Sequence, residues 1–352
     1  MHYKRVLASE TKPTLKLLLS SISALHMIKN KTMEGILSLI GNTPLVHLEN
    51  IFAEYNFEFY GKMEMQNPGG SIKDRTSYRI ITHAFQEGKI SSDTVIIEST
   101  SGNMGIGLAQ VCLYYGLKLI LVVDPHINAQ ATRLLETYGA EFVVVTEHDG
   151  KGGYLKTRLK KVEELLAKYP NSFNPNQYHN HDNPLAHRQT INEIHESLGY
   201  FPDYILIPTS TCGTLMGFAK ELHRQKAKTK VIAVDSVGSV IFDDIPQLRR
   251  IPGMGSSQHS HFLDQNLIDQ VIHIHDEECI TGCHELLKKE SILAGGSSGA
   301  IISAIEKIAN KIERKASVVG IFADRGERYL DTIYNKEWIS RYFPHTVKIK
   351  NV

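Results

Sequence analysis

The sequence predicts an α/β protein in which parallel strands are buried between layers of helices. Short apolar runs alternate with stretches of helical spacing, and several runs are nearly continuous, as in strands that are buried on both faces. The chain has 352 residues, 42% of them hydrophobic, so it can bury a sizeable core. This length favours about two domains or one large α/β unit. We therefore expect two doubly wound α/β layers that the chain crosses back and forth.

The expected elements alternate along the chain. In the first half they begin with a strand and continue helix, strand, helix, strand: DTVIIEST (93–100), GIGLAQVCLYYG (105–116), LKLILVVD (117–124), NAQATRLLETYG (128–139) and AEFVVVTE (140–147). Both of these helices end at glycine, a common helix terminator. After the glycine-rich stretch HDGKGGY, residues 155–169 predict a charged helix. Strand patterns return in YILIPTSTCGT (204–214), KVIAVDSVG (230–238) and ASVVGIFADRG (316–326).

Charge and composition narrow the range of partners. The 39 Lys and Arg residues balance 38 Asp and Glu residues, which argues against a nucleic-acid or membrane surface and favours a small ligand. No apolar stretch reaches the roughly 18 residues of a transmembrane helix. The apolar run TLKLLLSSISALHM is broken by serines, so residues 1–32 are interpreted as a poorly specified extension and the cytoplasm as the default location.

Cysteine and histidine spacing predicts neither disulfides nor a metal site. Four irregularly spaced cysteines form no CxxC pair: Cys112, Cys212, Cys279 and Cys283. Three histidine pairs have i, i+2 spacing, but no cysteine or acidic cluster accompanies them at ligand spacing. Buried thiols in a reducing compartment are the expected state.

Three glycine-rich turns follow apolar runs, where open α/β sheets bind their ligands. STSGNMGIG (99–107) leaves backbone amides free to face an anion, and it matches neither the dinucleotide fingerprint nor the Walker A pattern. STCGTLMG (210–217) offers hydroxyls and amides that suit a phosphate. AGGSSGA (294–300) also precedes a helix. Each turn alone could be an ordinary helix cap, but together the first two suggest a phosphate on one ligand and a carboxylate on another.

Lys73 lies in an unusual setting for a surface lysine, within NPGGSIKDRT (67–76). A lysine that performs covalent chemistry is held where its amine can lose a proton and reach an electrophile such as an aldehyde. Pyridoxal phosphate is an aldehyde cofactor that carries a phosphate, and it needs a lysine, a phosphate site and a group at its pyridine nitrogen. Lys73 and the three turns could supply these parts.

Seven motifs in order resemble the cysteine synthase and cystathionine β-synthase superfamily: IGNTPLV, NPGGSIKDR, STSGNMG, NQYHNHDNP, STCGTLMG, GGSSGA and GERYL. The likeness extends from about Gly35 to about Phe343. It implies a fold type II pyridoxal-phosphate enzyme, similar to the tryptophan synthase β subunit, with the cofactor between two domains. It implies a larger cofactor-binding domain from residues 33–75 and 178–352, and a smaller mobile domain from residues 76–177. It also implies a homodimer.

The resemblance implies roles at the matching positions. Lys73 matches the Schiff-base lysine, Asn103 the asparagine that bonds the cofactor's 3′-oxygen, and Ser297 the hydroxyl facing the pyridine nitrogen. A serine there, unlike an aspartate, holds no proton on the nitrogen, which favours expulsion of a β-leaving group. The phosphate is expected at Ser210, Thr211, Cys212, Gly213 and Thr214, although most relatives have glycine at position 212. The substrate α-carboxylate is expected at Thr100, Ser101, Gly102, Met104 and Gln177.

Other segments resemble N-(2-amino-2-carboxyethyl)-L-glutamate synthase. Met104 stands where ordinary cysteine synthases usually have threonine, and HDGKGGYLKTR, DSVGSVIF and ADRGERYLD are not their usual stretches. That enzyme of siderophore and antibiotic pathways joins O-phospho-L-serine to L-glutamate on the way to 2,3-diaminopropionate, so these two amino acids are the implied substrates. The candidates for binding their additional charges are Arg133, Tyr154, and Arg249 or Arg250.

Two alternatives stay open. One is a cysteine synthase that uses O-acetylserine or O-phosphoserine with sulfide, against which Met104 and the glycine-rich 148–154 stretch argue. The other is a binding or regulatory protein that has lost catalysis, against which Lys73, Asn103 and Ser297 argue. A nicotinamide dehydrogenase is poorly supported because its glycine fingerprint is missing.

Overall fold

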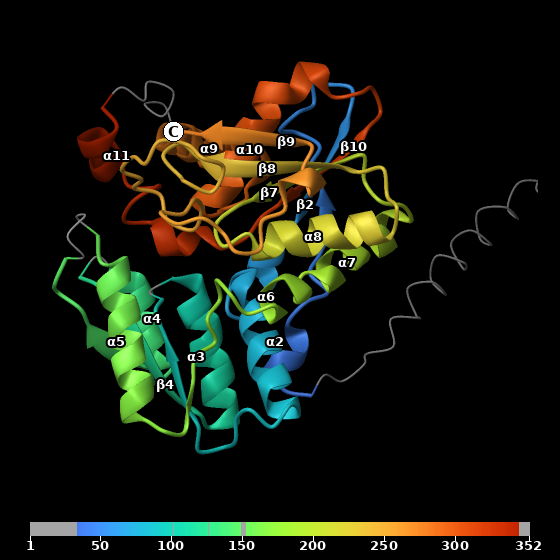
Figure 1. Ribbon diagram of the computed structural model, residues 1–352. Helices are drawn as coiled ribbons and strands as arrows, with labels where there is room; N and C mark the ends of the chain where they lie inside the picture. The colour runs from blue at the N-terminus through green and yellow to red at the C-terminus, as the bar shows by residue number, and fades with distance from the viewer. Residues whose placement is uncertain (1–33, 101, 126, 149–152, 345–352) are drawn as a thin grey trace, which may run out of the picture.

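The protein is built around two separate sheets. The computed structural model describes residues 34–100, 102–125, 127–148 and 153–344. The larger sheet has six strands in the order β1-β2-β10-β7-β8-β9, and the smaller has four in the order β5-β4-β3-β6. Figure 1 shows the two sheets in two lobes that meet near helices α2, α6 and α8. Apart from β1, which runs antiparallel to β2, the paired strands are parallel, so the predicted α/β class is confirmed.

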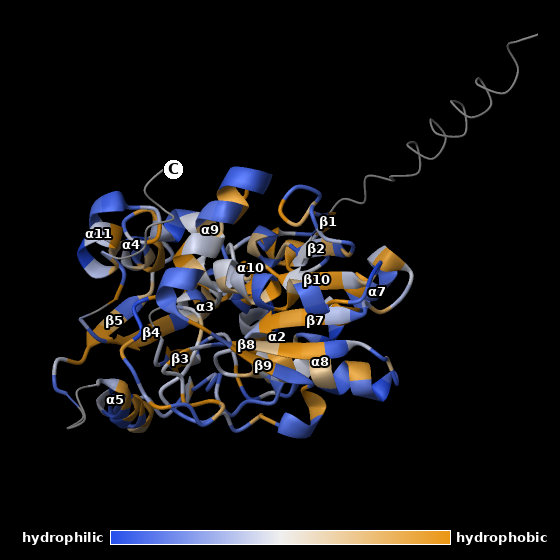
Figure 2. Cartoon of the chain, turned by 90° about the horizontal axis from the view of Figure 1, so that it is seen from above, coloured by the Kyte–Doolittle hydropathy of each residue, from blue (hydrophilic) through white to orange (hydrophobic). Residues whose placement is uncertain are grey.

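Helices cover both faces of the larger sheet. Its strands are β1 (Leu45–His47), β2 (Glu58–Lys62), β7 (Tyr204–Pro208), β8 (Lys230–Ser236), β9 (Gln270–Ile274) and β10 (Ser317–Ile321). Because side chains alternate along a strand, Ile205 and Ile207 pack with α7 (Arg188–Leu198) and α8 (Gly213–Arg224). Leu206 instead faces the core formed with α9 (Asp276–Glu290) and α10 (Gly296–Ile308). Strands β7 and β8 are accordingly orange in Figure 2, whereas exposed turns of the helices are blue.

The smaller sheet is also covered on both faces. Its strands are β3 (Val95–Glu98), β4 (Lys118–Val123), β5 (Glu141–Val144) and β6 (Ser172–Phe173). Leu119 and Leu121 pack with α2 (Lys73–Gln86), α3 (Asn103–Tyr115) and α4 (Ala129–Thr137). Ile120 and Val122 face α5 (Leu155–Lys168) on the other side. The remaining short elements are α6 (Asp182–Leu185), α11 (Lys336–Tyr342), η1 (Ile36–Leu39), η2 (Glu64–Gln66), η3 (Gln265–Leu267), η4 (Ala309–Lys311) and η5 (Gly326–Tyr329).

Helix α2 is attached to the larger lobe by four buried charged residues, here called the buried ionic cluster: Lys62, Glu64, Arg75 and Glu193. Arg75 bonds Glu64 at 2.7 Å and Glu193 at 2.7 Å, and Lys62 bonds Glu193 at 2.6 Å. The cluster joins β2, η2, α2 and α7. Arg75, the member of the cluster on α2, lies two residues after Lys73. The cluster therefore holds the first turn of α2 against the larger sheet.

The strands predicted from apolar runs are confirmed as β3, β4, β5, β7, β8 and β10, whereas β1, β2, β6 and β9 were not predicted. Strand β2 includes Lys62, and a charged residue does not predict a buried strand. The structure places Glu193 beside Lys62, and this ion pair allows the charge to be buried. Among the described residues, no helix combines the length and apolar character required to cross a bilayer. The predicted domain boundaries stay a prediction, and the boundary after Arg75 lies inside α2.

Candidate active site

Lys73 is the first residue of α2, three positions after the Pro-Gly-Gly turn that ends at Gly70. Gly70 has a left-handed backbone with φ 82°, and the Gly69 amide donates to the Asp74 carboxylate at 2.6 Å. The half-buried Lys73 side chain lines a cavity, and its amine has no hydrogen-bond partner among the described residues. Burial lowers the pKa of Lys73, and nearby Asp324 only partly offsets this effect. The amine is therefore easier to deprotonate than that of a surface lysine.

Residues 210–214 form a cup at the N-terminus of α8. Cys212 has φ 61°, a left-handed conformation that turns the chain into the helix. The Thr211 hydroxyl accepts from the Gly213 amide at 3.3 Å and from the Asn183 side-chain amide at 3.1 Å. A Cβ on Gly213 would collide with the Asn183 side chain, so this position requires glycine, and the first turn of the helix presents backbone without a side chain. Such a helix N-terminus with adjacent hydroxyls suits a phosphate.

The turn between β3 and α3 lies on the other side of the cavity, within the smaller lobe. Thr100, Gly102, Asn103 and Met104 line the cavity there, together with Gln177 from the segment before α6. Ser101 lies outside the described residues. The turn follows buried Glu98, whose pKa burial raises to about 7 and whose carboxylate accepts from the Ser99 amide at 2.9 Å.

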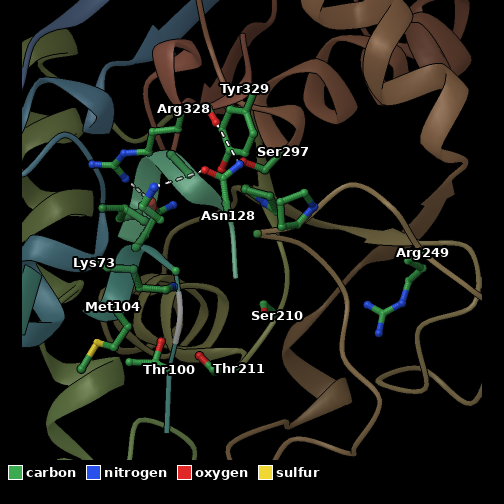
Figure 3. A pocket seen from close by; sticks show the side chains of 18 of the residues that line it. Lys73, Thr100, Met104, Asn128, Ser210, Thr211, Arg249, Ser297, Arg328 and Tyr329 are labelled. Atoms are coloured by element: carbon green, nitrogen blue, oxygen red, sulfur yellow. Dashed lines mark hydrogen bonds between the residues drawn. The ribbon is translucent and has the colours of Figure 1, made fainter. Parts of the chain in front are cut away.

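The third predicted turn brings Ser297 to the same cavity. Ser297 is buried in the first turn of α10, and its hydroxyl has no hydrogen-bond partner among the described residues. The turn is joined to the strand β10 region because the Gly295 amide donates to the Asp324 carbonyl at 3.0 Å. Figure 3 shows Ser297 near Tyr329, with Ser210 and Thr211 on the opposite side of the view.

Asn103 is surrounded by three residues for which the sequence predicted no role: Asp324, Arg328 and Tyr329. The Asn103 side-chain amide donates to Asp324 at 2.7 Å, and its oxygen accepts from Arg328. Tyr329 donates to the same Asp324 carboxylate, and Arg328 also donates to the Gly69 carbonyl. Burial raises the pKa of Asp324, although Arg328 opposes the shift. Arg328 and Tyr329 belong to the GERYL motif, so the motif was visible in the sequence but its contact with Asn103 was not.

The cavity brings most of the predicted residues together. It has a volume of about 840 Å³, within the usual range for a small-molecule site. Of the predicted residues it is lined by Lys73, Thr100, Gly102, Asn103, Met104, Gln177, Ser210, Thr211, Cys212, Gly213, Thr214, Arg249, Arg250 and Ser297. The lining that was not predicted includes Asn128, Arg328, Tyr329, Trp338 and Tyr342. These residues lie in turns and helices that are distant from Lys73 in the sequence, so no local sequence pattern predicts that they meet it.

Arg133 and Tyr154 do not belong to the described lining of this cavity. Arg133 is exposed on α4. Tyr154 precedes α5, where its hydroxyl lies 3.1 Å from His148 Nε2 and its ring lies over the imidazole. The roles predicted for both residues stay predictions.

Comparison with known proteins identifies the family. The model of the family described as pyridoxal-phosphate dependent enzyme matches residues 36–324. The chain belongs to this family. Its fold is therefore that of a pyridoxal-phosphate enzyme.

Similar solved structures narrow the superfamily of this pyridoxal-phosphate enzyme. A hydrogen sulfide-producing enzyme from Fusobacterium nucleatum is 34% identical, with 85% of this chain and 99% of that chain covered and a TM-score of 0.80. An O-acetylserine dependent cystathionine beta-synthase from Helicobacter pylori is 33% identical, with 86% and 99% covered and a TM-score of 0.79. An O-ureido-L-serine synthase is 29% identical, with 87% and 96% covered and a TM-score of 0.80. The chain thus belongs to the fold type II cysteine synthase and cystathionine β-synthase superfamily, and it is a β-replacing enzyme.

The cavity fits pyridoxal phosphate chemically. Lys73 provides an amine with a lowered pKa and, among the described residues, no hydrogen-bond partner, and the helix start at Gly213 provides an anion site. The Ser297 hydroxyl, which also has no partner among these residues, lines the same cavity. When bound, the cofactor supplies an electrophilic aldehyde and an electron-withdrawing ring.

Proposed function

We propose that the enzyme joins O-phospho-L-serine to L-glutamate, giving N-(2-amino-2-carboxyethyl)-L-glutamate and inorganic phosphate. In this β-replacement the bond between Cβ and oxygen of the donor breaks, and a bond forms between that Cβ and the glutamate nitrogen. The product is a precursor of 2,3-diaminopropionate. We also propose that the enzyme is a homodimer, to be checked by light scattering of the purified protein, and that it is cytoplasmic.

The charge of the cavity wall carries this proposal. Besides Lys73, whose pKa is lowered, three arginines belong to the described lining, and no aspartate or glutamate does: Arg249, Arg250 and Arg328. Both candidate reactions share the cofactor phosphate, but a phosphorylated donor and a dicarboxylate acceptor bring more negative charge than O-acetylserine and sulfide. A cationic wall at low dielectric favours such ligands and repels cationic ones.

The residues of the chain take the following parts under this proposal. The cup at 210–214 binds the cofactor phosphate, Ser297 faces the pyridine nitrogen, and Asn103 orients the ring. Thr100, Ser101, Gly102, Met104 and Gln177 bind the α-carboxylate of the donor. Lys73 removes the proton from the donor α-carbon and later returns a proton, for which its lowered pKa is suited.

A cysteine synthase reaction is the second candidate. It is favoured by the likeness to a hydrogen sulfide-producing enzyme and to an O-acetylserine dependent enzyme, both at one third identity. The O-ureido-L-serine synthase shows in turn that nucleophiles other than sulfide occur among similar structures. The donor and acceptor must therefore be decided by experiment.

The deciding experiment follows the visible absorbance of the reconstituted protein together with the products by mass spectrometry. We expect O-phospho-L-serine to change the cofactor spectrum, L-glutamate to restore it, and one phosphate to appear for each product molecule. A spectrum that changes with O-acetyl-L-serine and is restored by sulfide but not by glutamate would instead establish the cysteine synthase reaction. Absence of any cofactor absorbance after reconstitution would contradict the role of Lys73.

A further inference from the structure

Arg249 stands apart from the other cations of the cavity because its charge is unpaired. It lies in the long segment between β8 and β9, and its guanidinium donates to the Met254 carbonyl at 3.3 Å. Its Nε is buried and has no hydrogen-bond partner in the described part of the chain. No carboxylate of the described residues forms an ion pair with it, and Asp235 and Asp276 act on it only from a distance. A partly buried guanidinium with an unmade hydrogen bond is unfavourable unless a ligand completes it.

The other three basic residues of the lining are assigned to the cofactor, have partners or are exposed. Lys73, whose pKa burial lowers, is assigned to the cofactor aldehyde. Arg328 donates to Asn103 and to the Gly69 carbonyl. Arg250 is exposed and lies over the Tyr342 ring, 4.3 Å from the ring centroid. Arg249 is thus the lining cation with capacity left for an anion, within the part of the chain that the structure describes.

The local backbone makes room for this guanidinium. Gly255 has a left-handed conformation with φ 74°, and a Cβ at this position would collide with Arg249 Nη1. Gly255 is also tied to the phosphate cup, because the Ser210 hydroxyl donates to its carbonyl at 3.2 Å and its amide donates to the Thr209 carbonyl at 2.7 Å. The segment therefore holds Arg249 at a set position relative to the cup.

The position of Arg249 separates it from the anion sites already assigned. In Figure 3, Lys73, Thr100 and Met104 lie on one side of the cavity and Arg249 lies on the other, with Ser210 and Thr211 between them. The cofactor phosphate has the helix start at Gly213, and the α-carboxylate has the turn after β3. The charges that remain are the phosphate of the donor and, because the donor carboxylate still occupies the turn after β3, the two carboxylates of the acceptor, of which the distal one lies on its side chain.

We propose that Arg249 is the specificity residue that binds the side-chain anion of the amino-acid substrates. Both substrates occupy the same cavity at successive stages, because the phosphate leaves the β-carbon of the donor and the glutamate nitrogen then adds to that same carbon. A guanidinium can bind a phosphate or a carboxylate through two parallel N–H bonds, so one residue can serve both. This inference rests on the proposed function, since it assumes that at least one substrate is anionic in its side chain.

The test compares charged and neutral substrates on the cofactor-loaded enzyme. Dissociation constants for O-phospho-L-serine and O-acetyl-L-serine are measured by titration of the visible absorbance, for wild type, Arg249→Met, Arg249→Lys and Arg133→Met. Arg314→Met, an exposed arginine outside the described cavity lining, is the control for the loss of one positive charge. In a second arm, KM is measured for L-glutamate and for neutral L-glutamine as acceptors.

We expect Arg249→Met to weaken the anionic substrate by about 10- to 100-fold, the usual effect of losing a charge-assisted hydrogen bond pair. The neutral analogue changes by less than about twofold, Arg249→Lys recovers part of the affinity, and Arg314→Met has no effect. The affinity for pyridoxal phosphate itself stays unchanged.

Several results would overturn the proposal. Equal loss for the charged and the neutral donor would indicate a merely structural role, and a loss of cofactor affinity would assign Arg249 to the cofactor phosphate. A charge-dependent loss in Arg133→Met but not in Arg249→Met would move the role to Arg133. If wild type uses only O-acetyl-L-serine, the proposed donor is wrong but the acceptor arm still tests Arg249. If wild type uses only sulfide, the proposed acceptor is wrong but the donor arm still does so. If no substrate with an anionic side chain reacts, both proposals fail together.

Discussion

Replacing Glu193 with glutamine tests whether the buried ionic cluster holds the start of α2. The carboxylate accepts four hydrogen bonds, from Lys62 Nζ at 2.6 Å, Arg75 Nη1 at 2.8 Å, Arg75 Nη2 at 2.7 Å and the Asn42 amide at 2.9 Å. Each carboxylate oxygen accepts two of them. A glutamine keeps one acceptor oxygen and turns an NH₂ group toward two donors, so two bonds are lost whichever way the amide is oriented.

The substitution also leaves a buried positive charge without its partner. The cluster of two cations and two anions becomes positive by one unit, with side chains that are at most 7% exposed. Removing one partner of such a buried pair costs about 3–5 kcal/mol. That is a large share of the roughly 5–15 kcal/mol by which a folded domain is usually stable.

The free energy of unfolding is measured by urea denaturation of the cofactor-loaded protein. Glu164→Gln is the matched control, because Glu164 pairs with Lys161 at 2.5 Å on the exposed face of α5, where solvent screens the ion pair and it contributes little to stability. The double variant Lys62→Met/Glu193→Gln restores neutrality, so we expect it to lose less stability than the sum of the single variants. A loss for Glu193→Gln no larger than that of the control would refute the reasoning.

The same cluster predicts a pH dependence with a definite sign. Burial by itself raises the pKa of Glu193, but Arg75 and Lys62 outweigh it, so the pKa is lowered in the folded state. A group of this kind contributes stability above its unfolded pKa of about 4.3, and that contribution is lost as the pH falls through the folded value. Glu193→Gln removes this contribution, so the difference between wild type and variant shrinks in acid.

Three further predictions concern the cavity itself. Lys73→Met lowers the rate of β-replacement by at least about 10²-fold, because the group that moves the α-proton is gone; unchanged product formation would exclude that role. Cys212→Val weakens pyridoxal-phosphate binding, because a β-branched residue is strained at φ 61°, whereas Cys212→Gly and the control Cys112→Val leave it nearly unchanged in an equilibrium titration. Glu98, whose pKa burial raises to about 7, holds a proton in the folded state over a range where the unfolded chain has lost it. Wild type therefore loses up to about 1.4 kcal/mol per pH unit relative to Glu98→Gln as the pH rises from about 4.5 to about 7 in thermal or urea unfolding, and parallel curves would contradict this.

The sequence predicted that the first two glycine-rich turns follow buried strands, and they follow β3 and β7 at the carboxyl ends where such sheets bind ligands. The prediction was wrong for the third turn, which follows α9, and because β3 and β7 belong to different sheets, sheet geometry alone did not require the turns to meet. Local chemistry at Lys73, Gly213 and Ser297 then indicated a cofactor with an aldehyde and a phosphate. These parts of the site depend on short stretches of sequence that carry their own signal.

The contacts between distant segments could not be predicted in this way. Asp324 bonds Asn103 across more than two hundred positions, and nothing near either residue indicates the other. Nothing in the sequence favoured Arg249 over the other candidate arginines. The structure distinguishes it among the candidates because its buried Nε has no hydrogen-bond partner among the described residues. Arg133 was another candidate for the additional charges of the implied substrates, and the described cavity lining does not include it. Side-chain pairing across the fold is a property of tertiary structure, which periodicity does not encode.

The cavity is bordered by two independently packed hydrophobic cores. Thr100 and Asn103 follow the smaller sheet, whereas Thr211 and Ser297 begin helices of the larger one. A ligand that touches both walls binds only when both cores are folded and apposed, so its binding energy is shared between them as thermodynamic linkage. At a thousandfold excess over its dissociation constant, such a ligand adds about 4 kcal/mol to the folded state. A cofactor bound across this cavity would therefore stabilise the two cores together, in addition to supplying the chemistry.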